Sequence, residues 1–231
     1  MRALAGWLVA SLLAIALILG AVVLGTRKVG EALDPSPETI VSASLQGLRE
    51  QNRLSAFVAR YVAVVTSTQT RFGLSARKTL IMPGTVRYEV DLAKLNPADL
   101  RWDAQGRTLF VTLPPVELVG PQVDLTQLRE YDGGGLLMRI SDAEAKLDAS
   151  NRRAGQTELL RQAREPVPMN LAKDATRRAL ERSFALPLRA AGLEAQVRVR
   201  FPDDPGFRDQ AREDWDRSRA IGDVYSEKAK S

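Results

Sequence analysis

The sequence predicts an α+β fold: an N-terminal transmembrane helix, then a mainly antiparallel sheet with C-terminal helices packed on it or projecting from it. Three observations support this. Residues 4–25 form one uncharged apolar run, residues 55–113 hold segments of alternating apolar side chains, and residues 142–186 return to the helical period. The chain then divides into an anchor at 1–26, a linker at 27–37, an α+β domain at 38–202 and a polar tail at 203–231.

The N-terminal apolar run is long enough to cross a bilayer. As a helix, residues 4–25 would extend roughly 33 Å, against about 30 Å for the hydrocarbon core. The alternative is a cleaved signal peptide, which has a shorter apolar core followed by a small-x-small site. The Ala14-Ile15-Ala16 match lies in the middle of the run, so cleavage there would leave an apolar terminus. We expect a retained anchor.

The charges beside the anchor bear on its orientation. Arg2 precedes the run and Arg27 and Lys28 follow it, so the flanking positive charges nearly balance. Long domains cross membranes largely regardless of charge, and a short N-terminal flank is typical of an anchor whose N-terminus stays inside. We therefore expect the domain after the anchor to face away from the cytoplasm.

Composition excludes several chemistries, because the chain contains neither histidine nor cysteine. Ser-His-Asp and Cys-His nucleophilic sites cannot be built from this chain alone, and zinc, haem and iron–sulfur sites lose their usual ligands. We expect no cofactor and no bound metal. The net charge of +5 is modest and mixed in sign, and it accompanies no aromatic-rich basic motif, so it does not indicate nucleic-acid binding.

The expected elements follow in order. Ser36 and Glu38 mark the start of a short helix that reaches about Arg49. Pro83-Gly84 is expected to interrupt the second strand as a bulge or turn. Period-two alternation predicts four strands that pair into one sheet, at 55–66, 78–92, 108–113 and 195–201.

Two helices are expected before the last strand. The first runs over about 142–164 and is ended by Pro166 and Pro168. The second runs over about 171–186, begins after Asn170 as its cap, and carries a narrow Ala-rich apolar stripe. The residues after the last strand are polar, and we expect a tail with at most one weak helix.

Several short motifs, taken in order, resemble a known family. They are Val90-Asp91-Leu92 at the end of a hairpin, the LPPVEL segment at 113–118, Asp124, an Ala/Arg-rich helical pair and a closing strand at 197–201. Over roughly residues 38–201 the chain resembles the bacterial family known as domain of unknown function 4230. The resemblance implies an anchored envelope domain, here in the inner membrane with its domain in the periplasm. It implies no catalytic residues.

Glu89 and Asp91 are the candidate catalytic carboxylates. They lie two residues apart on one predicted strand, so their side chains share a face at about 7 Å, a separation found in glycoside hydrolases. Thr85 and Arg87 share that face, however, which is typical of an ordinary solvated surface. Asp91, at the strand end, also suits a turn-capping residue.

Two further motifs fail the context that their chemistry requires. Ser75 and Lys78 have the S-x-x-K spacing of acyl enzymes, but that pair must lie on one turn of a buried helix, and Lys78 leads into a strand. The glycines at 133–135 are a candidate phosphate-binding loop, but no Lys-Ser/Thr pair follows them. We interpret them as a loop.

Arg178 and Arg182 are the candidate contacts for anionic lipid. Their i, i+4 spacing places them on one helix face, and arginines bind phosphate groups well. A solvated helix face is the alternative, because Asp174 and Glu181 dilute the positive charge.

These observations favour a non-enzymatic module of the bacterial envelope that mediates interaction, assembly or lipid contact. Its expected partners are the membrane, through one helix, and a second protein or another copy of the chain. A carboxylate-based hydrolase acting in the envelope is the alternative function.

Overall fold

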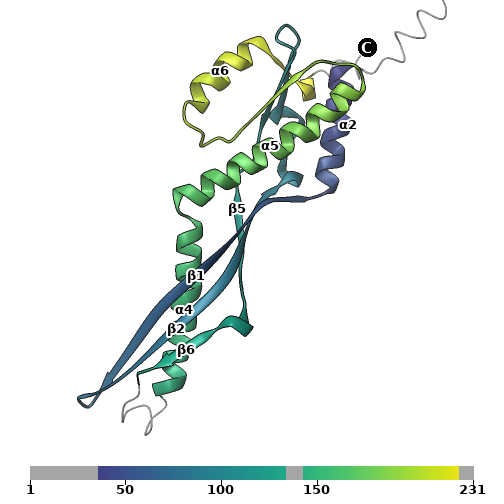
Figure 1. Ribbon diagram of the computed structural model, residues 1–231. Helices are drawn as coiled ribbons and strands as arrows, with labels where there is room; N and C mark the ends of the chain where they lie inside the picture. The colour runs from purple at the N-terminus through teal and green to yellow at the C-terminus, as the bar shows by residue number, and fades with distance from the viewer. Residues whose placement is uncertain (1–35, 134–142, 224–231) are drawn as a thin grey trace, which may run out of the picture.

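The computed structural model describes residues 36–133 and 143–223. The expected anchor at 1–26 and nearly all of the linker lie outside these residues. Among the helices that are described, none combines the length and apolarity needed to cross a membrane. The described chain is elongated and has two parts (Figure 1). We call them the arm, which contains residues 53–91, 117–132 and 143–163, and the head, which contains residues 37–50, 100–112 and 166–220.

The arm is built on one long β-hairpin. β1 (Arg53–Arg71) pairs antiparallel with β2 (Leu74–Asp91), and a two-residue turn, Phe72-Gly73, joins them with positive φ angles of 51° and 77°. β5 (Glu117–Val123) and β6 (Arg129–Asp132) both pair with the other side of β2. β1 is therefore an edge strand of this sheet.

One helix covers one face of the hairpin. α4 (Ala143–Ala163) packs on β1 and β2 and buries every fourth residue along one side. Glycines allow this close approach. A Cβ added at Gly155 would lie 2.9 Å from the Met82 sulfur, and one added at Gly84 would lie 2.6 Å from a methyl group of Leu159. Small and aliphatic side chains in close contact thus hold α4 against the hairpin.

The head contains a second sheet with the strand order β7-β4-β3-β8. β3 (Leu100–Asp103) pairs antiparallel with β4 (Thr108–Thr112) and with β8 (Arg219–Ala220). β7 (Gln196–Arg200) pairs with β4 in the parallel direction. β7 is therefore the edge strand at one side of the head sheet.

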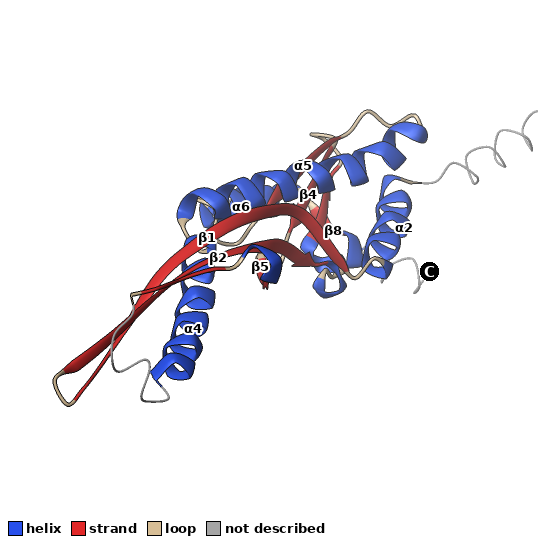
Figure 2. Cartoon of the chain, turned by 60° about the horizontal axis from the view of Figure 1, so that its bottom comes forward, coloured by secondary structure: helices blue, strands red, loops and turns tan. Residues whose placement is uncertain are grey.

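Three helices surround the head sheet (Figure 2). α2 (Pro37–Glu50) packs against α5 (Pro166–Ala190), and both contribute to the core on one face of the sheet. α6 (Phe207–Arg217) lies against the side chains of the opposite face. Short 3-10 turns complete the fold: η1 (Leu92–Lys94), η2 (Pro97–Asp99) and η3 (Leu125–Gln127).

The largest core lies in the head. Alternate residues of β4 and β7 pack against every fourth residue of α5, as expected where one face of a sheet meets one side of a helix. The fully buried side chains of this core include Leu100, Leu109, Leu113, Leu180, Phe184 and Phe201.

The α+β architecture, the mainly antiparallel pairing and the C-terminal helices are confirmed. The expectation of one sheet is wrong, because the strands form two sheets. The strands expected at 55–66 and 78–92 extend to form the arm, whereas those at 108–113 and 195–201 pair with each other in the head. That pairing is parallel because α5 crosses over between β4 and β7.

Proline positions account for two further differences. Pro83 and Gly84 do not interrupt β2. Pro83 carries its nitrogen on the side away from β1, where its ring removes no hydrogen bond to that strand. Pro166 and Pro168 begin α5 rather than only ending α4, because prolines in a first turn have no N–H that would need a partner. Asn170 is consequently inside the helix and does not cap it.

The stretch expected to be a polar tail is part of the head up to Asp223. α6 and β8 fall within it, and Ile221 is fully buried in the main core. Most of the exposed side chains of α6 are charged, which is why the sequence alone predicts a polar tail here. Residues 224–231 lie outside the described part of the chain.

Candidate anion-binding groove

Glu89 and Asp91 lie in a network of ion pairs where the arm joins the head. Glu89 accepts a hydrogen bond of 3.0 Å from the Arg87 guanidinium and lies 3.6 Å from Arg53. Asp91 lies 3.4 Å from the Lys94 ammonium, and its carboxylate accepts a backbone N–H of η1 at 3.1 Å. The turn-capping interpretation of Asp91 is therefore confirmed.

Glu117 from β5 completes this network. Its carboxylate lies 3.0 Å from Arg53 and 2.7 Å from Lys94. The hydrogen bond from Lys94, with help from Arg53, holds the pKa of Glu117 below its ordinary value. These charges neutralise one another, but Glu89 is only 9% exposed, so the network is a partly buried set of ion pairs rather than the solvated surface that the sequence offers as the alternative to a catalytic pair.

Lys78 is buried in the arm and surrounded by carboxylates. Its ammonium lies 2.8 Å from Glu130 and 3.7 Å from Glu144, and it also pairs with Asp148 of α4. Burial by itself lowers the pKa of Lys78, but the hydrogen bonds to Asp148 and Glu130 outweigh burial and raise it. Ser75 is exposed, and three residues along a strand place it on the opposite face. The pair therefore cannot act as a Ser-Lys nucleophile.

The triple glycine falls mostly outside the described residues. Gly133 follows β6, and its N–H donates to the Arg77 carbonyl at 2.9 Å, which continues the strand edge. Gly134 and Gly135 are not described. Within residues 36–133 and 143–223, no group of three or more acidic side chains is placed to hold a metal ion.

Arg178 and Arg182 line a groove between α5 and the edge strand β7. The pocket there has a volume of about 600 Å³, and Arg189 from the last turn of α5 also lines it. Leu180, Phe184 and Leu188 of α5 pack in the core of the head and thereby fix which side of the helix faces the groove. Arg198 borders the groove from the edge strand β7 and also lines the pocket beside α6, because its neighbours Val197 and Val199 are the residues that face α5.

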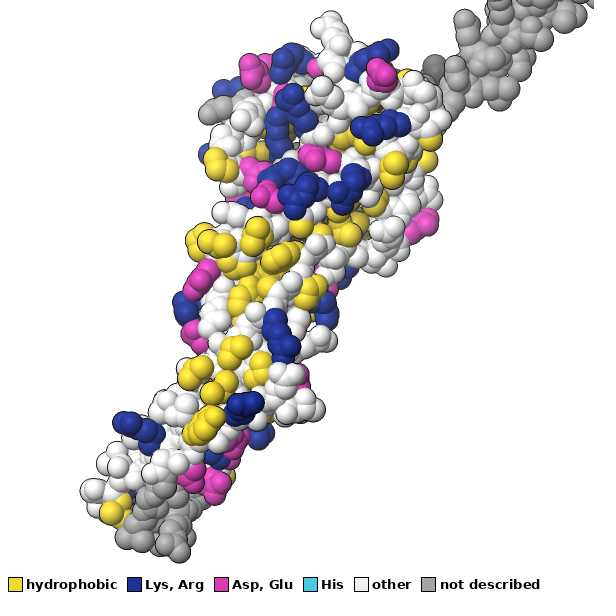
Figure 3. Space-filling model, in the orientation of Figure 1, with side chains coloured by type: hydrophobic (Ala, Val, Ile, Leu, Met, Phe, Trp, Pro, Cys, Tyr) yellow, Lys and Arg dark blue, Asp and Glu magenta, His cyan; other side chains and the backbone are white. Residues whose placement is uncertain are grey.

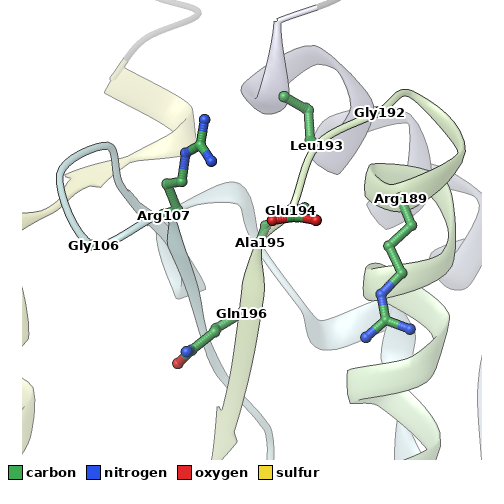
Figure 4. Close-up of a pocket in the computed structure, with 8 residues that line it drawn as sticks. All are labelled: Gly106, Arg107, Arg189, Gly192, Leu193, Glu194, Ala195 and Gln196. Atoms are coloured by element: carbon green, nitrogen blue, oxygen red, sulfur yellow. The ribbon is translucent and has the colours of Figure 1, made fainter.

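The groove continues past the end of α5 into a second pocket of about 750 Å³, and the two pockets share Arg189, Ala195 and Gln196. Gly192, with a φ of 76°, ends the helix and turns the chain toward β7. Arg107 reaches the pocket from the β3–β4 turn. In Figure 4, Arg107 and Arg189 lie on either side of the segment that carries Glu194 and Ala195.

The basic side chains of this groove are exposed and unpaired. No ion pair within 4 Å joins any of them to a carboxylate in the described part of the chain, although Glu181 and Glu194 also line the groove. The other side of the same helix differs, because Arg177 pairs with Asp204 at 3.0 Å and Lys173 pairs with Asp203 at 2.6 Å. The five unpaired arginines are Arg107, Arg178, Arg182, Arg189 and Arg198.

The groove also has apolar surface. Leu186 is 65% exposed in its α5 wall, and Ala185 and Val197 line it beside the arginines. Guanidinium groups bind phosphate oxygens in a bidentate manner, and adjacent apolar side chains suit a ligand with a hydrocarbon part. The groove therefore fits an anionic ligand that carries both a phosphate group and a hydrocarbon part.

Sequence reasoning identified Arg178 and Arg182 but did not connect Arg107 and Arg198 with them. These two residues reach the groove because β4 and β7 run parallel, which places the Gln196 N–H 2.9 Å from the Arg107 carbonyl. The alternation of Val197, Arg198 and Val199 signals a strand with a basic face, but it does not show which helix that strand lies beside.

A family model described as "Protein of unknown function (DUF4230)" matches residues 46–199. That range covers most of the arm and both walls of the groove. Neither a curated protein nor a solved structure matches the chain.

Proposed function

The chain belongs to the DUF4230 family of proteins of unknown function, and we propose that it is a single-pass bacterial envelope protein that binds anionic lipid headgroups through the α5–β7 groove. In this proposal, residues 4–25 are a retained anchor and the chain that follows them lies outside the cytoplasm. The protein acts by contact with the membrane and with other proteins, and not by catalysis.

The unpaired arginines of the groove are the observation that carries the proposal. Five exposed guanidinium groups with no described carboxylate partner leave a local positive charge that the fold does not use. A basic side chain near an anionic bilayer contributes about 1 kcal/mol to binding. Several arginines in one groove therefore supply enough attraction to hold an anionic headgroup.

The position of the groove supports lipid as the source of the anion. α2 starts beside the C-terminal end of α5, so the chain enters the head next to this groove (Figure 1). Leu193 of the groove packs against the hydrophobic cluster that contains Val41 of α2. A linker over residues 27–35 spans at most roughly 30 Å, which would keep this end of the head near the membrane surface.

The surroundings of the carboxylates favour this function over hydrolysis. A general acid or base needs a carboxyl group that is free to exchange a proton with substrate. Glu89 and Asp91 are instead tied to Arg53, Arg87 and Lys94.

Native mass spectrometry of the full-length chain in neutral detergent tests the proposal. Phosphatidylglycerol should bind more tightly than phosphatidylcholine, and the triple variant Arg178→Gln, Arg182→Gln, Arg189→Gln should lose roughly two orders of magnitude of that affinity. The matched control is Arg152→Gln with Arg153→Gln, two exposed arginines of α4 in the arm, which should change nothing.

Inorganic phosphate distinguishes a lipid from a soluble anion. If phosphate at millimolar concentration displaces the lipid, the groove binds soluble anions as well as headgroups. Equal binding of both lipids, or equal losses in the groove and control variants, would contradict the proposal.

A further inference from the structure

β1 is a long strand with a free edge. Its pairing with β2 covers residues 53–71, and among described residues it pairs with no other strand. The two-residue turn after Arg71 makes Arg71 and Leu74 a hydrogen-bonded pair, so alternate residues from Tyr61 to Arg71 bond to β2. The even-numbered residues between them direct their N–H and C=O groups away from β2.

In the described chain, one side chain bonds to the backbone of this free edge. The Gln162 amide donates to the Val62 carbonyl at 3.3 Å. Backbone groups of an exposed edge strand are a template for pairing with another strand. Among described side chains only Gln162 occupies a backbone group of this edge, and its 3.3 Å bond to the Val62 carbonyl must open for a second strand to pair on both sides of Ala63.

The side chains of β1 lack the usual protection of an edge. Proteins commonly place lysine, proline or several charges on exposed edge strands. Residues 54–70 contain no lysine and no proline, and Arg60 is their one charged residue. Val58, Val62 and Val64 are 53%, 48% and 63% exposed instead. Figure 3 shows hydrophobic side chains gathered along the middle of the arm, between the charged head and the tip.

We propose that β1 pairs antiparallel with β1 of a second copy, which joins the two arm sheets into one continuous sheet of eight strands. An antiparallel pair of identical strands has twofold symmetry, so every contact forms twice. In the register centred on Ala63, Val62 of one copy faces Val64 of the other. This surface is distinct from the groove, and the proposal does not depend on lipid binding.

Charge supports a second copy as the occupant. Within residues 54–70, β1 offers a strongly charged partner only one charged side chain, Arg60. In the register centred on Ala63, Arg60 lies opposite Thr66 of the second copy, so no like charges come together. If both copies are anchored in one membrane, their confinement raises the effective concentration for this pairing.

Multi-angle light scattering of the full-length chain in detergent tests the proposal. The wild type should be a dimer at micromolar concentration, and both Val64→Pro and Val64→Lys should raise its dissociation constant at least tenfold. Proline removes an N–H that points away from β2, and lysine places two like charges near the axis, so the fold should survive both changes. Leu125→Lys, at a residue that is 74% exposed on η3, is the matched control and should remain dimeric.

Spin labels test the register, because the chain has no native cysteine to remove. Labels on Thr68→Cys should lie roughly 33 Å apart in the dimer, and labels on Phe72→Cys roughly 60 Å apart, at 3.3 Å per residue from an axis at Ala63. A monomeric wild type, a dimer that Val64→Pro and Val64→Lys leave intact, or equal distances at both sites would overturn the proposal.

Discussion

Lys78 in the arm is 5% exposed and lies within 4 Å of three carboxylates, whereas Arg182 in the head is exposed and pairs with no described carboxylate. The ion pairs of Lys78 therefore hold α4, β2 and β6 of the arm together. Within residues 36–133 and 143–223, the groove arginines hold no elements together through ion pairs, so their removal should affect ligands far more than folding. Substitutions in each region test this division of roles.

The largest expected effect is on the arm. Lys78→Met removes the cation that pairs with Glu130, Glu144 and Asp148 and should lower the free energy of unfolding by about 2–3 kcal/mol, because it leaves carboxylates unpaired near a buried site. Arg182→Ala should change it by less than about 0.5 kcal/mol. Urea denaturation followed by circular dichroism measures both values.

A second substitution checks the cause. Asp148→Asn in the Lys78→Met background should recover part of the lost stability, because it removes one of the unpaired charges. A loss below about 1 kcal/mol in Lys78→Met, or no recovery in the double variant, would show that the cluster is not what stabilises the arm.

The contrast can also be tested within α5, at two neighbouring arginines. The Arg177 guanidinium donates to the Val199 carbonyl at 3.1 Å and pairs with Asp204 at 3.0 Å, whereas Arg178 faces the groove. Arg177→Ala should cost about 1–2 kcal/mol in the free energy of unfolding, and Arg178→Ala less than about 0.5 kcal/mol. Lipid affinity should show the reverse order. Similar losses of stability at both positions would mean that the groove arginines are structural.

Local sequence pattern predicted the elements but not their assembly. The helix starting after Ser36, the alternation from Val86 to Leu92 and the helix over 143–163 all appear where periodicity and caps place them. Sequence alternation reports which face of a strand is buried, but it does not report which strand lies beside it. The division into two sheets depends on α5 carrying the chain from the arm to the far side of the head, which no local pattern encodes.

The candidate site was predictable to the same extent. The i, i+4 spacing of Arg178 and Arg182 predicts one basic helix face, and the structure places both on the groove. Arg107 joins them from a turn more than 70 positions away, through the parallel pairing of β4 and β7. The buried ion cluster of Lys78 was not predictable, because a lysine in an alternating strand normally marks the solvent side, and here α4 covers it with Asp148.

The smallest expected effect is a pH dependence at the solvent side of α4, where paired charges lie at the surface. Hydrogen bonds from Arg161 and then Gln162 lower the pKa of Glu158 from 4.5 to about 2. Since the folded state binds this proton less readily than the unfolded state, the pair stabilises the fold fully above about pH 4.5 and loses this contribution as the pH falls toward 2. Glu158→Gln should therefore flatten the decline of stability between pH 4.5 and 2 and leave neutral pH nearly unchanged. Thermal unfolding across that range measures the slope, with Glu213→Gln, an exposed residue of α6, as the control. If the wild type and Glu158→Gln lose stability in parallel, the surface pair contributes as little as the groove arginines do, and the contrast between paired and unpaired basic side chains is confined to buried sites such as Lys78.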